Sequence, residues 1–220
     1  MEFFNNSVFF GVMLSLLAYG IGALLKQKFK LAIFNPLLIA VIIVIAVLAV
    51  SGIDKVYNEG AKYISYLLTP ATICLAIPLY EQFELLKSNW KAIAVGIFSG
   101  VLASLGSILA MAVLFGFTHQ EYVSFLPKSI TTAIGMGISE ELGGYVSITV
   151  AIIVLTGVLG NMCAESVCKL FKIEEPIAKG IAIGTASHAI GTSKAMELGD
   201  IEGAMSSLSI VVSGLITVIG

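Results

Sequence analysis

The feature that most constrains this chain is a succession of long apolar runs, several of which reach the length of a membrane-spanning helix. Residues 8–25 form the first run and residues 89–117 the longest, and a helix needs only about 17 to 25 apolar residues to cross a bilayer. The chain is 58% hydrophobic and 12% charged, whereas roughly a quarter of a typical soluble domain is charged. These values predict an all-α integral membrane protein, because a helix satisfies its backbone polar groups internally.

The apolar runs predict about seven to eight membrane segments within a single transmembrane domain, residues 1–220. The expected segments are residues 8–25, 31–50, 62–80, 89–117, 122–142, 147–170, 177–198 and 204–219. Three lysines at positions 26, 28 and 30 separate the first two segments. Positive charge favours the cytoplasmic side, so this connection is expected inside and the N-terminus outside.

Two of the expected segments are interrupted. Residues 62–80 contain Pro70 and Pro78, and proline removes a backbone donor and clashes with the preceding turn, which predicts a broken helix. Residues 122–142 are too polar for a helix that faces lipid, and they either cross the membrane or re-enter. Re-entry places the lysines of residues 169–179 on the cytoplasmic side, and irregular backbone at that depth must be buried or line a cavity.

Small residues and internal similarity add two expectations. Gly96, Gly100 and Gly106 are expected to be close-packing positions in the long helix. Short matches relate two repeat-like halves, about residues 1–117 and 118–220, either in parallel or inverted. Corresponding interrupted segments in two halves indicate the midplane binding site of a secondary transporter.

Polar residues concentrate in two stretches, residues 128–141 and 184–198. Such groups are tolerated in a membrane mainly where they face the bundle interior or a water-filled cavity, so they are candidates for function. Helical spacing places the polar residues of each stretch on a shared face. We expect the two stretches, with residues 69–72 as a weaker third contributor, to face each other across a polar cavity.

These stretches have the chemistry to hold a small carboxylate. A helix broken inside the membrane exposes N–H groups and a positive dipole end, while hydroxyls add donors and lysines add a counter-charge. The candidate substrate-binding residues are Thr69, Thr72, Lys128, Thr131, Thr132, Ser139, Thr185, Ser187, His188, Thr192 and Lys194. His188 is the first candidate for proton coupling because imidazole titrates near physiological pH, and Glu140 and Glu141 are the second.

Each candidate also has a purely structural interpretation. Ser187 and Thr192 could serve as hydrogen-bonding contacts between helices, and His188 could be structural as well. Lys128 could extend to the membrane interface, and Glu141 could be solvated at a loop edge. An intramembrane hydrolase that uses Ser187 and His188 is disfavoured, because adjacent helical residues point about 100° apart.

Other classes of function are not indicated. The net charge is −2 and no basic face is present, so a nucleic-acid partner is not expected. Cys74, Cys163 and Cys168 lie in or beside apolar segments, where a thiol behaves as a small hydrophobe, and no disulfide or metal site is expected. The N-terminus lacks the positive charge of a cleavable signal peptide. No catalytic residue and no cofactor is predicted.

Four ordered motifs resemble one known family. They are KSITT at residues 128–132, ISEELGG at residues 138–144, GTASHAIGT at residues 184–192 and EGAMSSL at residues 202–208. Together they closely resemble the LrgB/CidB family, and the resemblance covers nearly the whole chain. That family includes bacterial antiholin-like proteins and the membrane domain of the plastid glycolate/glycerate translocator.

The resemblance implies two functions, which remain open at this stage. One is a transporter of small monocarboxylates such as pyruvate, glycolate or glycerate, which could be proton-coupled. The other is an antiholin-like or holin-like regulator of murein hydrolase export and autolysis. The resemblance also implies a multi-pass protein of the bacterial cell membrane that works with an LrgA/CidA-type membrane partner, and we expect a homo-oligomer.

Overall fold

The computed structural model describes residues 9–29 and 34–219, apart from the side chains of Leu68 and Thr72. Every regular element in this part of the chain is a helix, as the apolar runs predict. The helices form two compact units, Met1–Cys74 and Leu75–Gly220. The division therefore precedes the long helix, whereas the predicted boundary between repeat-like halves at residue 117 stays a prediction.

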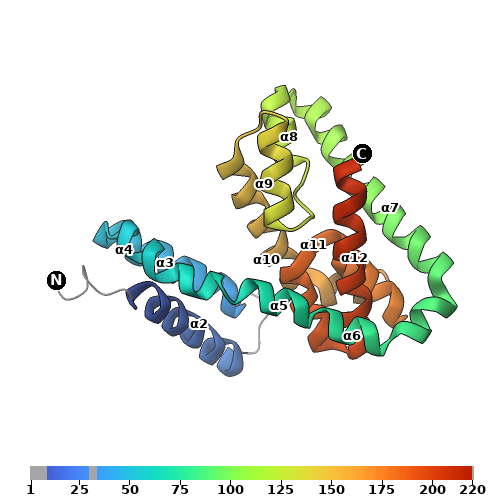
Figure 1. Ribbon diagram of the computed structural model, residues 1–220, viewed down its shortest axis with the longest axis horizontal. Helices are drawn as coiled ribbons and strands as arrows, with labels where there is room; N and C mark the ends of the chain where they lie inside the picture. Colours follow the sequence, from blue (N-terminus) through green and yellow to red (C-terminus); the bar gives the residue numbers. More distant parts are fainter. Residues whose placement is uncertain (1–8, 30–33, 220) are drawn as a thin grey trace. The chain divides into compact units, whose positions relative to one another are not determined.

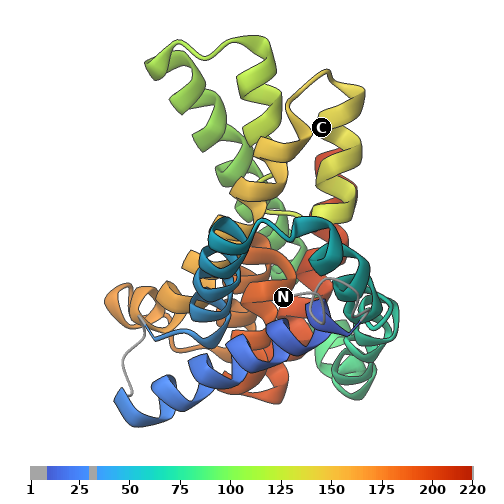
Figure 2. The ribbon, with the colours of Figure 1, turned by 90° about the vertical axis from the view of Figure 1, so that its left-hand side faces the viewer.

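The first unit is built on α2 (Phe10–Phe29), which packs against both α3 (Pro36–Ser51) and α4 (Asp54–Ser65) (Figure 2). Pro36 occupies the first position of α3, where an amide hydrogen has no partner within the helix. The Asn35 side chain accepts hydrogen bonds from the amides of Leu37 and Leu38, at 2.9 and 3.3 Å. α3 therefore begins at Pro36, within the segment predicted over residues 31–50.

The broken helix predicted over residues 62–80 is observed. α4 ends at Ser65, α5 spans Leu68–Cys74 in the first unit, and α6 spans Ala76–Glu81 in the second. Pro70 and Pro78 each occupy the third position of a short helix. The first-turn amides of a helix lack intrahelical acceptors, so each proline is accommodated at a new helix start.

The second unit combines the longest helix with a central one. α7 (Phe83–Phe115) has 33 residues and is about 50 Å long, which confirms a single long helix across the apolar run. α10 (Val146–Leu170), α11 (Pro176–Leu198) and α12 (Asp200–Ile219) complete the bundle (Figure 1). α12 contacts α6, α7 and α11, and 61% of its apolar window is buried against 22% in α7. It is therefore the central helix of this unit.

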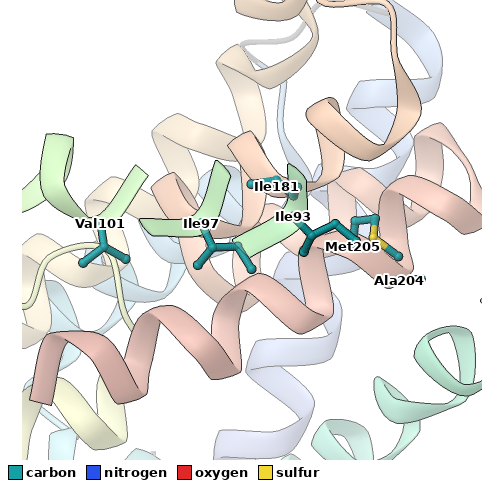
Figure 3. Packing of buried hydrophobic residues seen from close by; sticks show 6 residues of the cluster. All are labelled: Ile93, Ile97, Val101, Ile181, Ala204 and Met205. Atoms are coloured by element: carbon teal, nitrogen blue, oxygen red, sulfur yellow. The ribbon is translucent and has the colours of Figure 1, made fainter. Parts of the chain in front are cut away.

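Apolar side chains join α7, α11 and α12. Ile93, Ile97 and Val101 recur at steps of four along α7 and lie against Met205 of α12 and Ile181 of α11 (Figure 3). These side chains are 7% exposed or less. The i, i+4 spacing puts these α7 residues on one apolar face. The neighbouring face of α7 carries small and polar residues instead, among them Gly96, Gly100 and Ser104.

The polar segment expected over residues 122–142 forms two short helices, a helical hairpin, instead of one continuous helix. α8 (His119–Phe125) and α9 (Thr132–Glu141) both pack against α10 and are joined by residues 126–131. Ten residues of helix span about 15 Å, half the hydrocarbon thickness, so neither helix crosses a bilayer alone. The interrupted form fits the re-entrant alternative better than a single crossing helix.

A capping box fixes the start of α8. Thr118 accepts a hydrogen bond from the Glu121 amide, and the Glu121 carboxylate accepts hydrogen bonds from the backbone and hydroxyl of Thr118. These hydrogen bonds favour the ionised carboxylate and lower the pKa of Glu121. The hairpin therefore begins at a defined residue, just after the left-handed Gly116 that ends α7.

Five described helical segments are long and apolar enough to cross a membrane: Phe10–Phe29, Asp54–Glu81, Phe83–Phe115, Val146–Leu170 and Asp200–Ile219. A multi-pass membrane protein is thus supported, while the count of seven to eight segments stays a prediction. Two of the three glycine predictions in α7 hold. A Cβ at Gly96 or Gly100 would contact α11, whereas one at Gly106 would meet nothing within 4 Å, so the close-packing prediction for Gly106 is wrong.

Candidate functional site

A cavity of about 860 Å³ lies between α7, α11 and the loop that joins α8 to α9, all within the second unit. Serines 99, 104 and 107 of α7 line one wall, and Thr185 lines the facing wall on α11. Lys128 and Ser129 of the hairpin loop line the cavity beside them. The cavity therefore brings together Lys128 and Thr185, one residue from each of the two polar stretches singled out in the sequence.

Lys128 supplies a positive charge to this cavity. Its Nζ donates hydrogen bonds to Ser129 Oγ at 2.9 Å and to Ser104 Oγ at 3.3 Å. Within residues 9–29 and 34–219, no carboxylate lies within ion-pair distance of Lys128. A half-buried ammonium group with only neutral partners is suited to hold an anion.

The serine hydroxyls around Lys128 have defined roles. Ser104 Oγ donates to Ser129 Oγ at 3.0 Å, and Ser129 Oγ also accepts from Lys128. Ser129 thus uses its lone pairs inside the cluster and keeps its proton, which it can donate to a ligand oxygen. The ammonium group and this hydroxyl form a donor pair that matches a carboxylate.

The rest of the cavity wall offers acceptors. Thr185 Oγ1 donates to Ile181 O at 2.8 Å, Ser99 Oγ to Gly96 O at 2.9 Å and Ser107 Oγ to Ser104 O at 2.8 Å. Each hydroxyl donates its single proton to a carbonyl of its own helix and retains lone pairs that can accept a hydrogen bond from a ligand. The cavity therefore combines a cationic donor end with walls that can accept hydrogen bonds.

Glu175 marks the other end of the cavity. It is the N-cap of α11 and lines the cavity together with Asn89 of α7. Ten residues separate Glu175 from Thr185, which corresponds to about 15 Å along the helix. Gly100 packs on Thr185 and lies one turn from Ser104, so Lys128 belongs to the Thr185 end. The charge along the cavity thus changes from acidic to basic.

The helix α11 is broken at Ser187 and His188. Their backbone angles are φ −133°, ψ 15° and φ 43°, ψ −146°, both outside the helical region. A positive φ is uncommon for a residue with a side chain, and such backbone persists only where surrounding contacts hold it. The sequence predicted interruptions in residues 62–80 and 122–142, so this break within the GTASHAIGT motif is an additional one that the structure shows.

Two glycines of α10 make room for the break. A Cβ on Gly157 would lie 2.7 Å from His188 Cε1, and one on Gly160 would overlap Ser187 Oγ and Cβ. His188 Nε2 donates to Ile153 O at 2.9 Å, since the carbonyl can only accept. Close approach of α10 and a hydrogen bond between the helices thus hold the irregular backbone in place.

The second half of α11 is tied to α12. Thr192 Oγ1 donates to His188 O, one turn earlier, at 3.0 Å. The same oxygen lies 2.7 Å from Ser206 Oγ of α12, and because Thr192 has already used its proton, Ser206 donates in that pair. The side chains of Ser187, His188 and Thr192 therefore all hydrogen-bond to protein atoms.

The break and the cavity are separate places. Ser187, His188 and Thr192 are 2% exposed or less, and none of them lines the cavity. They lie against α10 and α12, whereas the cavity lies on the α7 side of α11. The sequence grouped these residues into one site, and the structure divides them between a cavity wall and a buried helix discontinuity.

The other candidate residues lie elsewhere. Ser139 is buried and accepts a hydrogen bond from Thr149 at 2.7 Å. Thr131 and Thr132 begin α9 and are half-buried, and Glu140 and Glu141 are exposed at its end. None of these five lines the cavity.

Lys194 has carboxylate partners. Its Nζ lies 3.5 Å from Glu165 and 3.3 Å from Glu197, so its charge is compensated outside the cavity. Thr69 is exposed on α5 in the first unit, and the Thr72 side chain lies outside the described part of the structure. Among the described residues, no group of three His, Cys, Asp or Glu side chains could hold a metal ion.

Sequence reasoning missed the α7 wall of the cavity. Ser99, Ser104 and Ser107 were not singled out, although they recur with Gly96, Gly100 and Ala103 at helical steps of three and four. That stripe of small and polar residues was the available signal. Gly157 and Gly160 were missed as well, and their separation of three residues places them on one face of α10.

Comparison with known proteins finds related sequences but no matching solved structure. The model of the LrgB-like family matches residues 15–220. The chain is similar to antiholin-like protein LrgB of Bacillus mycoides (strain KBAB4), at 39% identity over 213 residues, 96% of this chain and 93% of that protein. The protein of the same name from Bacillus cereus (strain B4264) has the same identity and coverage. No solved structure matches the chain.

Proposed function

This chain belongs to the LrgB family, and we propose that it is a membrane transporter of small monocarboxylates of the pyruvate, glycolate and glycerate class. One observation carries the proposal. The cavity between α7 and α11 contains an ammonium group, Lys128, whose hydrogen-bond partners are the neutral hydroxyls of Ser104 and Ser129. An anion of a few atoms supplies the missing negative charge.

In this proposal, the carboxylate binds at the Lys128 end of the cavity. One carboxylate oxygen accepts a charge-assisted hydrogen bond from Lys128 Nζ and the other accepts the free proton of Ser129. A hydroxyl group on the substrate donates to Thr185 Oγ1, whose own proton is engaged by Ile181 O. Lys128 is the one cationic side chain among the described residues that line the cavity, so a second carboxylate would lack a counter-charge, which favours monocarboxylates over dicarboxylates.

Movement would use the discontinuity in α11. The half of α11 that precedes Ser187 forms the cavity wall, and the half that follows it is tied to α12 through Thr192 and Ser206. Helices broken at membrane depth form the binding sites around which several transporter folds move. His188, at the junction of the two halves, is the proposed proton-coupling residue, with the exposed Glu140 and Glu141 as the alternatives.

The proposed setting is the bacterial cell membrane, with an LrgA/CidA-type membrane partner and a homo-oligomeric state. Apolar side chains cover much of the outer surface of the described helices, among them Leu109, Val113 and Leu155 at 52%, 77% and 57% exposure. Such surfaces suit contact with lipid or with another membrane helix.

A second candidate function follows from the relatives. Two curated relatives at 39% identity are named antiholin-like, which favours a regulator of murein hydrolase export and cell lysis as the alternative. Regulation of this kind needs contact surfaces but no cationic cavity. The two functions are distinguished by whether the purified protein moves a carboxylate.

Uptake by purified protein tests the proposal. In proteoliposomes, we expect saturable uptake of labelled pyruvate, glycolate or glycerate above that of protein-free liposomes, and weak competition by a dicarboxylate such as succinate. Each assay is run with and without an LrgA-type partner from the same genome. Uptake at the protein-free rate with the partner present would contradict transport and favour the lysis regulator.

A further inference from the structure

The central helix α12 carries one hydroxyl group that differs from its neighbours. Ser207, Ser209 and Thr217 each donate to the carbonyl four residues earlier, at 2.7 to 2.8 Å. Ser213 does not, and its Oγ is the one buried side-chain polar atom without a hydrogen-bond partner in the described part of the chain. Ser213 is 2% exposed, so bulk solvent does not satisfy it.

Ser213 borders a second, very small cavity. This cavity measures about 10 Å³ and is also lined by Ser104, Ser129 and Thr185, three residues that line the large cavity as well. A volume near 10 to 15 Å³ holds one water molecule, which needs two to four polar partners. Ser129 has no lone pair left for it, but Ser104 and Thr185 each retain a lone pair and Ser213 retains its proton and lone pairs, so α7, α11 and α12 together meet that requirement.

We propose that a buried water molecule occupies this small cavity, accepts or donates a hydrogen bond at Ser213, and thereby positions the Lys128–Ser104–Ser129 cluster from behind. An unpartnered buried hydroxyl is costly, and a bridging water removes that cost. Ser213 is then a positioning residue: it does not touch the substrate, but it links the central helix to the group that does.

A monovalent cation is the competing occupant, because the polar side chains that line the small cavity all present hydroxyl oxygens. The position of Lys128 argues against it. The Lys128 ammonium group is hydrogen-bonded to Ser104 and Ser129, so a metal cation bound to the same two oxygens would face a like charge at close range. A neutral water meets no such repulsion.

Thermal unfolding of purified Ser213→Ala tests the bridge without any transport measurement. If water bridges Ser213 to the cluster, the variant loses those hydrogen bonds and its Tm falls by about 2–4 °C, as expected for a chain of this size. Ser209→Ala is the control on the same helix, since the Ser209 hydroxyl bonds only to Met205 O. A Tm for Ser213→Ala that is unchanged or higher than wild type would overturn the bridge, because removal of a truly unpartnered hydroxyl costs nothing.

Two further measurements locate the water. The Tm changes of Ser213→Ala and Ser104→Ala are expected to be non-additive, because both residues bind the same water, and additive changes would overturn the link. Replacing sodium by choline is expected to leave the wild-type Tm unchanged. A Tm that depends on sodium in the wild type but not in Ser213→Ala would replace the water by an ion.

The positioning role of Ser213 rests on the proposed transport function, and it is measured separately, through the KM for a monocarboxylate. In proteoliposomes, Ser213→Ala is expected to raise the KM for a monocarboxylate about two- to fivefold, from the loss of about one hydrogen bond in the support of Lys128, with little change in Vmax. Ser209→Ala leaves both constants unchanged. A fall in Tm with an unaltered KM would overturn the positioning role, whereas absence of uptake in the wild type would count against the proposed function alone.

Discussion

Replacing Lys128 by methionine is expected to lower carboxylate uptake at limiting substrate about 10- to 100-fold. The reason is the loss of the ammonium group that the proposed carboxylate binds, since a hydrogen bond to a charged group contributes about 1.5–3 kcal/mol and each 1.4 kcal/mol is a factor of ten. Methionine keeps the length and the apolar stem of lysine, so the wall beside Ser104 and Ser129 stays filled. Initial uptake rates in proteoliposomes at matched protein density give the measurement.

Two variants make the Lys128 result specific. Lys91→Met removes an exposed lysine from α7 that does not line the cavity, and it is expected to transport at the wild-type rate. Lys128→Arg keeps the charge but changes its geometry, and partial uptake is expected. If Lys128→Met transports within twofold of the wild type, Lys128 does not bind the substrate.

Replacing Gly160 by alanine is expected to lower Tm by about 2–12 °C and to abolish uptake. A Cβ at this position would overlap Ser187 Oγ and Cβ at the break in α11, so α10 and α11 must separate. Overpacking of this kind costs about 1–3 kcal/mol, and each kcal/mol shifts Tm by about 2–4 °C in a chain of this size. Thermal unfolding in detergent and uptake in proteoliposomes measure the two effects.

The chain offers a control and a rescue for this substitution. Gly106→Ala places the same methyl group in α7, where a Cβ meets nothing within 4 Å, and the higher helix propensity of alanine predicts an equal or higher Tm. Ser187→Gly removes both atoms that Gly160→Ala would overlap, so the double variant is expected to regain much of the lost Tm. Equal Tm values for the Gly160 and Gly106 variants would show that the close contact at the break is not stabilising.

The sequence predicted the helices well where the cause is local. Apolar length places α7 and α10, and Pro70 and Pro78 predict the interruption between Ser65 and Glu81. Each of these effects acts within a few residues along the chain, through a missing donor or a hydrophobic run. A single sequence is sufficient to locate them.

The site was predicted only in part, because its walls depend on contacts between helices. Thr185 and His188 are three residues apart and were placed on one face, but the break rotates the chain between them, so Thr185 faces α7 and His188 faces α10. Lys194 was expected to be a counter-charge for substrate, but Glu165 of another helix pairs with it. Partners of this kind cannot be identified from spacing within one segment.

Small residues explain the remaining misses. Gly100 and Gly106 are alike in sequence, yet a Cβ at Gly100 would meet Thr185 and a Cβ at Gly106 would meet nothing within 4 Å. Ser104 and Ser88 are likewise both serines of α7, and Ser104 lines the cavity while Ser88 does not. A small residue in a membrane helix permits close packing, a cavity or contact with lipid, and the neighbouring helix decides which one occurs.

Substrate protection of a single cysteine tests most directly whether the cavity between α7 and α11 binds the carboxylate. In a variant that lacks Cys74, Cys163 and Cys168, Ser99→Cys places a thiol on the exposed cavity wall, and Ser88→Cys places one on the same helix outside the cavity. A water-soluble thiol reagent is expected to label both, and saturating pyruvate or glycolate is expected to slow labelling of the Ser99 variant severalfold while leaving the Ser88 variant unchanged. Equal labelling rates of the Ser99 variant with and without a substrate that the protein transports would contradict binding in this cavity.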